Sequence, residues 1–202
     1  MSSTPRVGVL SLQGDVHEHI VALEACGART LKVRTGEDLS HIDALVIPGG
    51  ESTTMSRLAT TFKVMEPLRA AVKAGMPMYG SCAGMIMLAN RIEDGRSDQE
   101  TIGGLDITVR RNAFGRQVDS FEVPVKIPII SDVPFEGVFI RAPWVEQVGD
   151  DVDVLARIES GPRAGTIVAV QHDGLLATSF HPEITGDTRV HNYFVELVRQ
   201  RT

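Results

Sequence analysis

Short apolar strands alternate with helices through the first half of the chain, and this alternation is the strongest constraint on the fold. The predicted strands are residues 6–12, 30–33, 44–47 and 76–79, and the predicted helices are residues 15–26, 52–59, 65–74 and 85–89. Strands that are almost continuously apolar are typical of a parallel sheet covered on both faces. The pattern predicts an α/β protein whose ligands bind beyond the carboxyl ends of its strands.

The second half of the chain has a different pattern. A polar segment at 93–104 precedes strand-like pieces and a final amphipathic helix, at residues 106–110, 121–126, 138–141, 152–158, 166–171, 175–178 and 187–200. We interpret the pieces as hairpins added to the parallel sheet, with residues 159–165 as a flexible turn. We expect one domain over residues 1–202.

Composition excludes several classes of function. The chain has 202 residues and a formal net charge of −6, and no Lys/Arg block suggests a nucleic-acid or anionic-membrane surface. Its two cysteines cannot form a disulfide framework, and the first residues do not resemble a signal peptide. No apolar run approaches the roughly 20 residues that span a bilayer. We therefore expect a cytoplasmic protein.

Cys82 lies in the string YGSCAG, residues 79–84, where a predicted strand turns into a helix. Small residues permit the sharp turn of a nucleophile elbow, which exposes the thiol and aims the next backbone amide at a developing oxyanion. A helix N-terminus also favours a thiolate. The alternative is that Cys82 is a small buried apolar residue, like most free cysteines.

His181 and Glu183 flank Pro182 directly after the strand at 175–178. Pro182 fixes φ, and we expect it to hold its neighbours in an extended geometry in which the carboxylate can reach the imidazole. A Cys/His/Glu relay needs this pair as acid/base and orienter. Without the elbow, a histidine before proline is more often structural.

A third signal is the string PGGESTT, residues 48–54, after the strand at 44–47. Its glycines allow a backbone amide to approach a reacting carbonyl, and the helix start favours negative charge. Taken alone, the string is better explained as a plain strand-to-helix turn capped by Ser52. The same holds for the turn around Gln13.

Other histidines and the second cysteine are predicted to carry no chemistry. His17 and His19 are two residues apart, so they face different sides of a helix, and we predict no metal site. His191 lies in the last helix, where a solvated or capping role is the default expectation. Cys26 is predicted to pack at a helix end.

The motifs together resemble a known family. GSCAG, the later His-Pro-Glu and the early Pro-Gly-Gly-Glu are similar to those of class I, triad-type glutamine amidotransferases, which implies a three-layer flavodoxin-like fold. The strings VGVLSLQGDVHEHI, PGGESTTM, RNAFGRQVDSFE and GVFIRAP resemble the glutaminase subunits of ribose 5-phosphate-dependent pyridoxal 5'-phosphate synthases. These strings are far more specific than the triad, and the resemblance covers most of the chain.

The resemblance implies hydrolysis of L-glutamine to L-glutamate and ammonia through a γ-glutamyl thioester, without a cofactor. The ammonia would pass through a channel to the synthase subunit of a large hetero-oligomer. By motif, Cys82 is the nucleophile, His181 the acid/base and Glu183 its partner. The backbone amides of Gly50 and Ala83 would form the oxyanion hole. The residues that hold glutamine would be Gly49, Gly50, Glu51, Arg111, Ile140 and Arg141, with Gln13 near the oxyanion strand and responsive to the partner.

The arginines fit the substrate, because a guanidinium can pair with the α-carboxylate of a free amino acid. Arg111 is one of two adjacent arginines, however, and without the motif we would interpret it as a solvated surface charge.

Three other functions stay open. The chain could be the glutaminase subunit of another ammonia-channelling synthase, such as imidazole glycerol phosphate synthase. It could be a cysteine peptidase or chaperone of the same superfamily, or a regulatory binding subunit.

Overall fold

The structure is a computed structural model that describes residues 4–111 and 120–201. Its strands are β1 (Arg6–Leu10), β2 (Arg29–Val33), β3 (Ala44–Ile47), β4 (Met78–Ser81), β5 (Ala89–Glu93), β6 (Leu105–Arg110), β7 (Ser120–Ile127), β8 (Ser131–Ile140), β9 (Trp144–Val148), β10 (Asp153–Arg157), β11 (Ile167–His172) and β12 (Leu175–Thr178). Its helices are α1 (Val16–Ala25), α2 (Ser52–Thr61), α3 (Met65–Lys73), α4 (Ala83–Leu88), α5 (Pro182–Thr185) and α6 (Arg189–Arg199), and a 3-10 turn η1 spans Asp38–His41.

The main sheet has a parallel half and a mostly antiparallel half. Ten of the described strands form it, in the order β2-β1-β3-β4-β12-β11-β9-β6-β5, with β10 beside β11. The five strands from β2 to β12 pair in parallel, whereas β11 and β9 pair antiparallel to their neighbours. The predicted sheet type is therefore confirmed. Because parallel strands end at one edge, the turns that carry Gln13, Gly49, Cys82 and His181 come together there.

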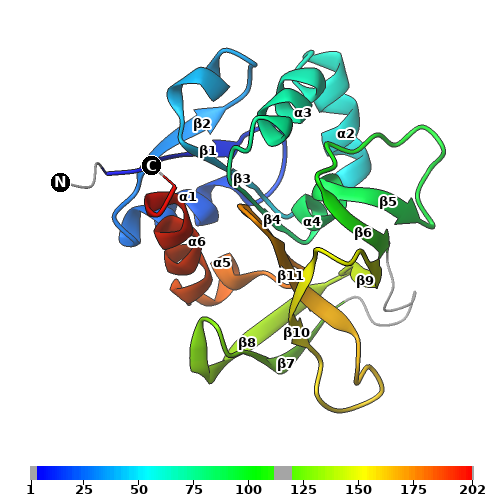
Figure 1. The fold of residues 1–202 in the computed structure, drawn as a ribbon. Helices are drawn as coiled ribbons and strands as arrows, with labels where there is room; N and C mark the ends of the chain where they lie inside the picture. The colour runs from blue at the N-terminus through cyan, green and yellow to red at the C-terminus, as the bar shows by residue number, and fades with distance from the viewer. Residues whose placement is uncertain (1–3, 112–119, 202) are drawn as a thin grey trace.

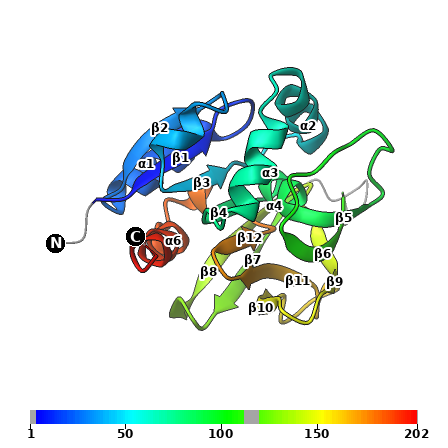
Figure 2. The same cartoon turned by 45° about the horizontal axis from the view of Figure 1, so that its top comes forward.

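Helices cover both faces of the sheet, which produces three layers (Figure 1 and Figure 2). On one face, α2, α3 and α4 pack through buried side chains that include Met55 and Leu68. On the other face, α1 and α6 contribute Leu23 and Phe194 to a second core. Because both faces are buried, the central strands are apolar along their whole length, as the sequence pattern indicates.

The β7–β8 hairpin forms a two-stranded sheet of its own, so the prediction that it extends the main sheet is wrong. Val125, Phe135 and Phe139 lie on its inner face and pack into the second core. Burial of one face is sufficient to hold an antiparallel hairpin in place, without ladder hydrogen bonds to the main sheet. This packing brings β8 to the functional edge, where the carbonyl of Val138 accepts the N–H of His181 at 2.9 Å.

Strands β5 and β9 were not predicted from the sequence. Their burial patterns show no regular alternation of buried and exposed residues. Strand β5 lies at the edge of the sheet, and the pairing of β9 with β6 contains a register shift. Without that alternation, the sequence carries no periodic signal for a strand.

Helix α6 has the amphipathic character that its spacing predicts. It is 11 residues long, and it buries Val190, Phe194 and Val198 while Glu196 remains exposed. In the part of the chain that the structure describes, no helix combines the length and apolar character needed to cross a membrane.

Candidate active site

Cys82 occupies a sharp turn between β4 and α4, as predicted for a nucleophile elbow. Its backbone has φ 48° and ψ −101°, a conformation that residues with a β-carbon rarely adopt. The N–H of Cys82 donates to the carbonyl of Thr178 on the neighbouring strand β12 at 2.8 Å, which anchors the turn to the sheet. The Sγ atom lies 3.9 Å from the carbonyl oxygen of Ile140 at the end of β8.

The small residue at Gly84 is required by the close approach of α4 to the sheet. A β-carbon added to Gly84 would lie 2.1 Å from the carbonyl oxygen of Ile47 in β3. No side chain fits at that distance, so only glycine lets the helix start directly behind Cys82. The sharpness of the elbow therefore depends on packing between α4 and β3.

His181 and Glu183 form a buried pair after β12. The imidazole Nδ1 lies 2.7 Å from Glu183 Oε1, and the two residues are only 3% and 6% exposed. The predicted extended geometry is wrong, because Pro182 is the first residue of α5 and Glu183 already lies in that helix. Proline suits the first helical position, where its missing N–H costs nothing. The carboxylate still reaches the ring.

Charged groups around His181 favour its protonated form. Burial lowers the pKa of His181, but a thiolate at the adjacent Cys82 and the Glu183 carboxylate outweigh this effect and raise the pKa to about 10. Because Nδ1 is bonded to Glu183, Nε2 remains for proton exchange with the thiol. A histidine held in this way can accept the proton of a thiol and return it to a leaving group.

Gly49 and Gly50 form the turn after β3 that faces His181. A β-carbon added to Gly49 would lie 2.3 Å from Cε1 of His181, so the ring packs directly on the backbone. The carbonyl of Gly49 accepts the N–H of Asp15 at 3.2 Å. In a trans peptide this directs the Gly50 N–H to the opposite side, away from Asp15.

Glu51 caps α2, and Gln13 holds the turn before it. The Glu51 carboxylate accepts the backbone N–H groups of Thr53 at 3.1 Å and Thr54 at 2.6 Å. Burial alone would raise the pKa of Glu51, but the hydrogen bonds from Thr54 and Thr53 lower it to about 2. Ser52 is the first residue of the helix, so capping by Ser52 is wrong. Gln13 Oε1 accepts the N–H of Glu51 at 2.8 Å.

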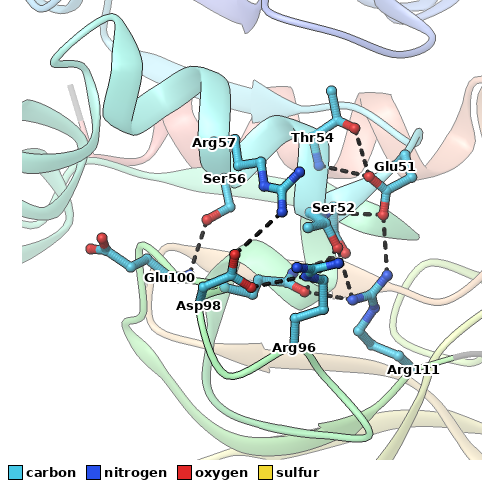
Figure 3. Close-up of polar contacts among 11 residues, drawn as sticks. Glu51, Ser52, Thr54, Ser56, Arg57, Arg96, Asp98, Glu100 and Arg111 are labelled. Atoms are coloured by element: carbon cyan, nitrogen blue, oxygen red, sulfur yellow. Dashed lines mark hydrogen bonds and ion pairs between the residues drawn. The ribbon is translucent and has the colours of Figure 1, made fainter.

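Arg111 reaches from the end of β6 to the start of α2 (Figure 3). Its guanidinium donates to Thr53 Oγ1 at 2.9 Å, to Gln99 Oε1 at 2.6 Å and to Glu51 Oε1 at 3.1 Å. The side chain is only 14% exposed, so the interpretation of Arg111 as a solvated surface charge is wrong. A guanidinium fixed by three acceptors is preorganised for a carboxylate.

The polar segment before β6 lies along α2 and supports Arg111, which the sequence did not predict. Besides accepting from Arg111, Gln99 donates to Ser52 Oγ at 3.0 Å. Asp98 pairs with Arg57 at 3.2 Å on the exposed side of the same helix (Figure 3). Nothing in the composition of this segment indicates such a role, because the contacts join residues far apart in the chain.

A cavity of about 480 Å³ lies at this edge of the sheet. Its volume is in the range of small-molecule sites. The predicted residues that line it are Gly50, Glu51, Cys82, Ala83, Arg111, Ile140, Arg141 and His181. Gly49, Gln13 and Glu183 are in contact with these residues from behind. Most of the string RNAFGRQVDSFE, residues 112–119, falls outside the described residues.

Four residues that line the cavity were not predicted from the sequence: Asp15, Ser52, Ile86 and Ile184. Asp15 places Oδ2 3.5 Å from His181 Nδ1, so a second carboxylate lies beside the ring. Burial raises the pKa of Asp15, and the charge of His181 opposes that rise. Its place after the first strand, at the shared edge, is a signal that could have identified it.

Asp15, His181 and Glu183 each place a potential ligand atom within 4.8 Å of the others. Two of these atoms, His181 Nδ1 and Glu183 Oε1, are hydrogen-bonded to each other. This hydrogen bond accounts for their short distance without a metal ion. The absence of a metal stays a prediction.

Two histidines lie buried behind Glu183. His191 is 0% exposed, so the prediction of a solvated or capping role is wrong. It faces inward from α6, and its Nε2 lies 2.9 Å from Nδ1 of His19 on α1. His17 is exposed whereas His19 is buried, which confirms that the two point to different sides of α1.

The fold and the cavity define a class of protein: an α/β enzyme of the triad-type glutamine amidotransferase kind, with a cysteine elbow facing a buried His–Glu pair. The chain belongs to the SNO glutamine amidotransferase family, whose model matches residues 9–200. This match confirms the family resemblance of the sequence motifs.

Named relatives are similar over nearly the whole chain. A protein of Kineococcus radiotolerans named pyridoxal 5'-phosphate synthase subunit PdxT is 61% identical over 202 residues, which cover 99% of this chain and 98% of the relative. A protein of the same name from Nocardioides sp. is 60% identical over 200 residues and covers 99% of each chain.

Solved structures agree with the fold. The crystal structure of a glutamine amidotransferase has a TM-score of 0.87 and 44% sequence identity, and the match covers 95% of this chain and 98% of that one. The structure of PurLQS from Thermotoga maritima has a TM-score of 0.67 at 17% identity, with 98% of this chain and 99% of that one covered, and shows likeness of fold alone.

Proposed function

We propose that the chain hydrolyses L-glutamine to L-glutamate and ammonia, and delivers the ammonia to a synthase subunit that makes pyridoxal 5'-phosphate. The observation that carries the hydrolysis is the placement of Cys82 and His181 in one cavity, with His181 bonded to Glu183 at 2.7 Å. Relatives near 60% identity that are named subunits of pyridoxal 5'-phosphate synthase support the acceptor. We further propose that residues 1–202 act as one glutaminase domain.

In the first half of the reaction, Cys82 Sγ attacks the side-chain amide carbon of glutamine after its proton passes to His181. The negative charge that develops on the amide oxygen would be stabilised by the backbone N–H groups of Gly50 and Ala83. His181 then returns its proton to the leaving nitrogen, the C–N bond breaks, and ammonia departs. The γ-glutamyl group remains on Cys82 as a thioester.

In the second half, His181 accepts a proton from water as the water attacks the thioester carbon. The C–S bond breaks, Cys82 regains a proton, and glutamate is released. Glu183 keeps the ring in the tautomer that leaves Nε2 free, and it stabilises the imidazolium in both halves. Water is the only co-reactant, so the steps need no cofactor.

The arginines of the cavity would bind the substrate. We assign the α-carboxylate to Arg111 and to Arg141, which both line the cavity. Gly49 and Glu51 lie in the turn between β3 and α2, which Gln13 holds in place, and Glu51 also fixes the guanidinium of Arg111. We place the working enzyme in the cytoplasm, in a large hetero-oligomer with the synthase subunit, whose binding would be sensed through Gln13.

The test measures glutamate release from glutamine by the purified chain, alone and with the synthase subunit of the same organism. Glutamine labelled with ¹⁵N at the amide reports whether the ammonia enters pyridoxal 5'-phosphate. We expect stimulation by the partner, labelled product, and loss of both in Cys82→Ala. Hydrolysis that survives in Cys82→Ala would overturn the assignment of the nucleophile. If hydrolysis depends on Cys82 but is the same with and without the synthase subunit, the assignment of that subunit as the ammonia acceptor is overturned. Another ammonia-channelling synthase would then be favoured.

A further inference from the structure

Behind Glu183, away from the cavity, lies a buried cluster of polar side chains in which His19 is hydrogen-bonded to Ser81 and His191. His19 on α1 places Nε2 3.0 Å from Ser81 Oγ and 3.6 Å from Glu183 Oε1. Its Nδ1 lies 2.9 Å from Nε2 of His191 on α6. His19, Ser81 and His191 are each 0% exposed, so water does not compete for these contacts.

We propose that His19 is a positioning residue for the triad: its Nε2–H faces Glu183 Oε1 and holds that carboxylate in line with His181. The inference rests on the proposed function, because it assigns Glu183 as the orienter of the catalytic histidine. His19 itself lies behind the carboxylate and does not line the cavity.

The carboxylate needs such a neighbour because only one of its oxygens is bonded. Glu183 Oε2 is buried and has no hydrogen-bond partner among the described residues. The position of the charge therefore depends on what contacts Oε1, which are His181 at 2.7 Å and His19 at 3.6 Å. If His19 is removed, His181 is left as the one described side chain that these distances place against Oε1, and the carboxylate can rotate away from the ring.

The contacts also decide which nitrogen of each histidine carries its proton. An ionised carboxylate can only accept, so a proton on His19 Nε2 is attracted to Glu183 Oε1 across 3.6 Å, whereas a lone pair there would be repelled; the hydrogen bond of this N–H itself is accepted by Ser81 Oγ at 3.0 Å. His19 Nδ1 then carries a lone pair and accepts the Nε2–H of His191. This leaves a lone pair on His191 Nδ1, an atom that is buried without a hydrogen-bond partner among the described residues. An unpaired acceptor is tolerated better than an unpaired N–H.

The surroundings of His19 keep its imidazole uncharged. Burial lowers the pKa of His19 well below its usual value, and the nearby His191 and His181 lower it further. The ionisable groups that face His19 come from β4, α5 and α6. Tyr79 meets the ring edge-on with centroids 6.1 Å apart, Glu183 approaches Nε2, and His191 approaches Nδ1. Asp187 acts on His191 only through its charge.

Two substitutions of similar size separate a positioning role from a packing role. In His19→Gln, an amide nitrogen can occupy the place of Nε2, donate to Ser81 Oγ and still present an N–H toward Glu183. In His19→Asn, the amide reaches only the place of Nδ1, near His191. If His19 merely filled space, both variants would suffer in proportion to their loss of stability.

The first readout is steady-state glutamine hydrolysis in the complex with the synthase subunit. For His19→Asn we expect kcat to fall about tenfold or more with KM within roughly twofold, because the lost contact acts on the relay and not on glutamine binding. For His19→Gln we expect kcat to recover to within a few-fold of the wild type. Equal losses in both variants would overturn the proposal.

The second readout does not require glutaminase activity. Alkylation of Cys82 by iodoacetamide is followed between pH 5 and 9 by mass spectrometry, which separates the Cys82 peptide from the Cys26 peptide. In His19→Asn the displaced carboxylate stabilises the imidazolium less, so we expect slower alkylation near pH 7 and a profile moved to higher pH. His19→Gln should follow the wild type. Identical profiles in all three proteins would refute the positioning role.

A third variant tests the same cluster from its far end. His191→Leu removes the N–H that donates to His19 Nδ1. The His19 proton can then move to Nδ1, which leaves a lone pair on Nε2 facing Glu183. Alkylation of Cys82 should therefore slow, as in His19→Asn. An unchanged profile in a folded His191→Leu protein would also count against the proposal. A dependence of alkylation on His19 in a protein that never hydrolyses glutamine would leave the inference intact and refute the proposed function.

Discussion

Gly49 and His181 are in direct contact across the sheet edge, with the imidazole Cε1 only 2.3 Å from where a β-carbon of residue 49 would stand. The glycine comes from the turn after β3 and the histidine from the turn after β12. The contact joins the segment that would supply an oxyanion donor to the residue that would move the proton. The relative position of these two groups is therefore set by backbone packing.

Gly49→Ala is expected to displace the His181 ring and to lower kcat of the complex on the order of 100-fold, because a shift near 1 Å has that effect on positioned groups. The control is Gly75→Ala, where an added β-carbon meets nothing within 4 Å and the only penalty is the positive φ of 84°. That variant should lose some stability and keep its activity. Equal activity in the two folded variants would contradict the role assigned to the Gly49 contact.

Arg111→Gln is expected to raise KM for glutamine roughly tenfold to a hundredfold, the effect of losing a hydrogen bond between charged groups, with a smaller change in kcat. Arg110→Gln is the matched control, because Arg110 pairs with Glu93 at 2.6 Å and Asp94 at 2.7 Å and does not line the cavity. Steady-state kinetics of both variants with the synthase subunit provide the measurement. A KM that rises as much in Arg110→Gln would show that the effect is general electrostatics.

Stability should fall in acid partly because of His191. Burial lowers the pKa of His191 from 6.5 to about 4, so its contribution is fully present above pH 6.5 and is lost as the pH falls toward 4. A shift of this size corresponds to roughly 3 kcal/mol. Urea unfolding at several pH values should show a shallower decline in His191→Leu than in the wild type. If the free energy of unfolding falls equally in both proteins as the pH is lowered, His191 has the same pKa in the folded and unfolded states.

Asp15→Asn tests the second carboxylate beside His181. Because Asp15 Oδ2 lies 3.5 Å from Nδ1 but is 38% exposed, its removal should lower the pKa of His181 only modestly. We expect alkylation of Cys82 near pH 7 to slow about twofold to fivefold. Glu18→Gln, which removes an exposed carboxylate in the first turn of α1, is the control. A rate that matches the control would show that solvent screens the Asp15 charge from the ring.

The sequence by itself determined the parallel half of the sheet and the triad candidates. Continuous apolar strands such as Ala44–Ile47 can be stable only when both faces are buried, and this local pattern is sufficient to predict them. Cys82 and His181 each follow such a strand directly, so the shared edge of the parallel strands predicts that they meet.

Only the tertiary structure decided the rest, because those features depend on contacts between distant segments. The β7–β8 hairpin packs as a separate sheet, and its own sequence cannot show which surface its apolar face will meet. The same applies to Arg111, which becomes buried against Glu51 and Gln99, and to His191, which lies on an apolar helix face but pairs with His19 of another helix. Buried polar side chains generally need hydrogen-bond partners, and for Arg111 and His191 those partners lie in segments that only the fold brings near.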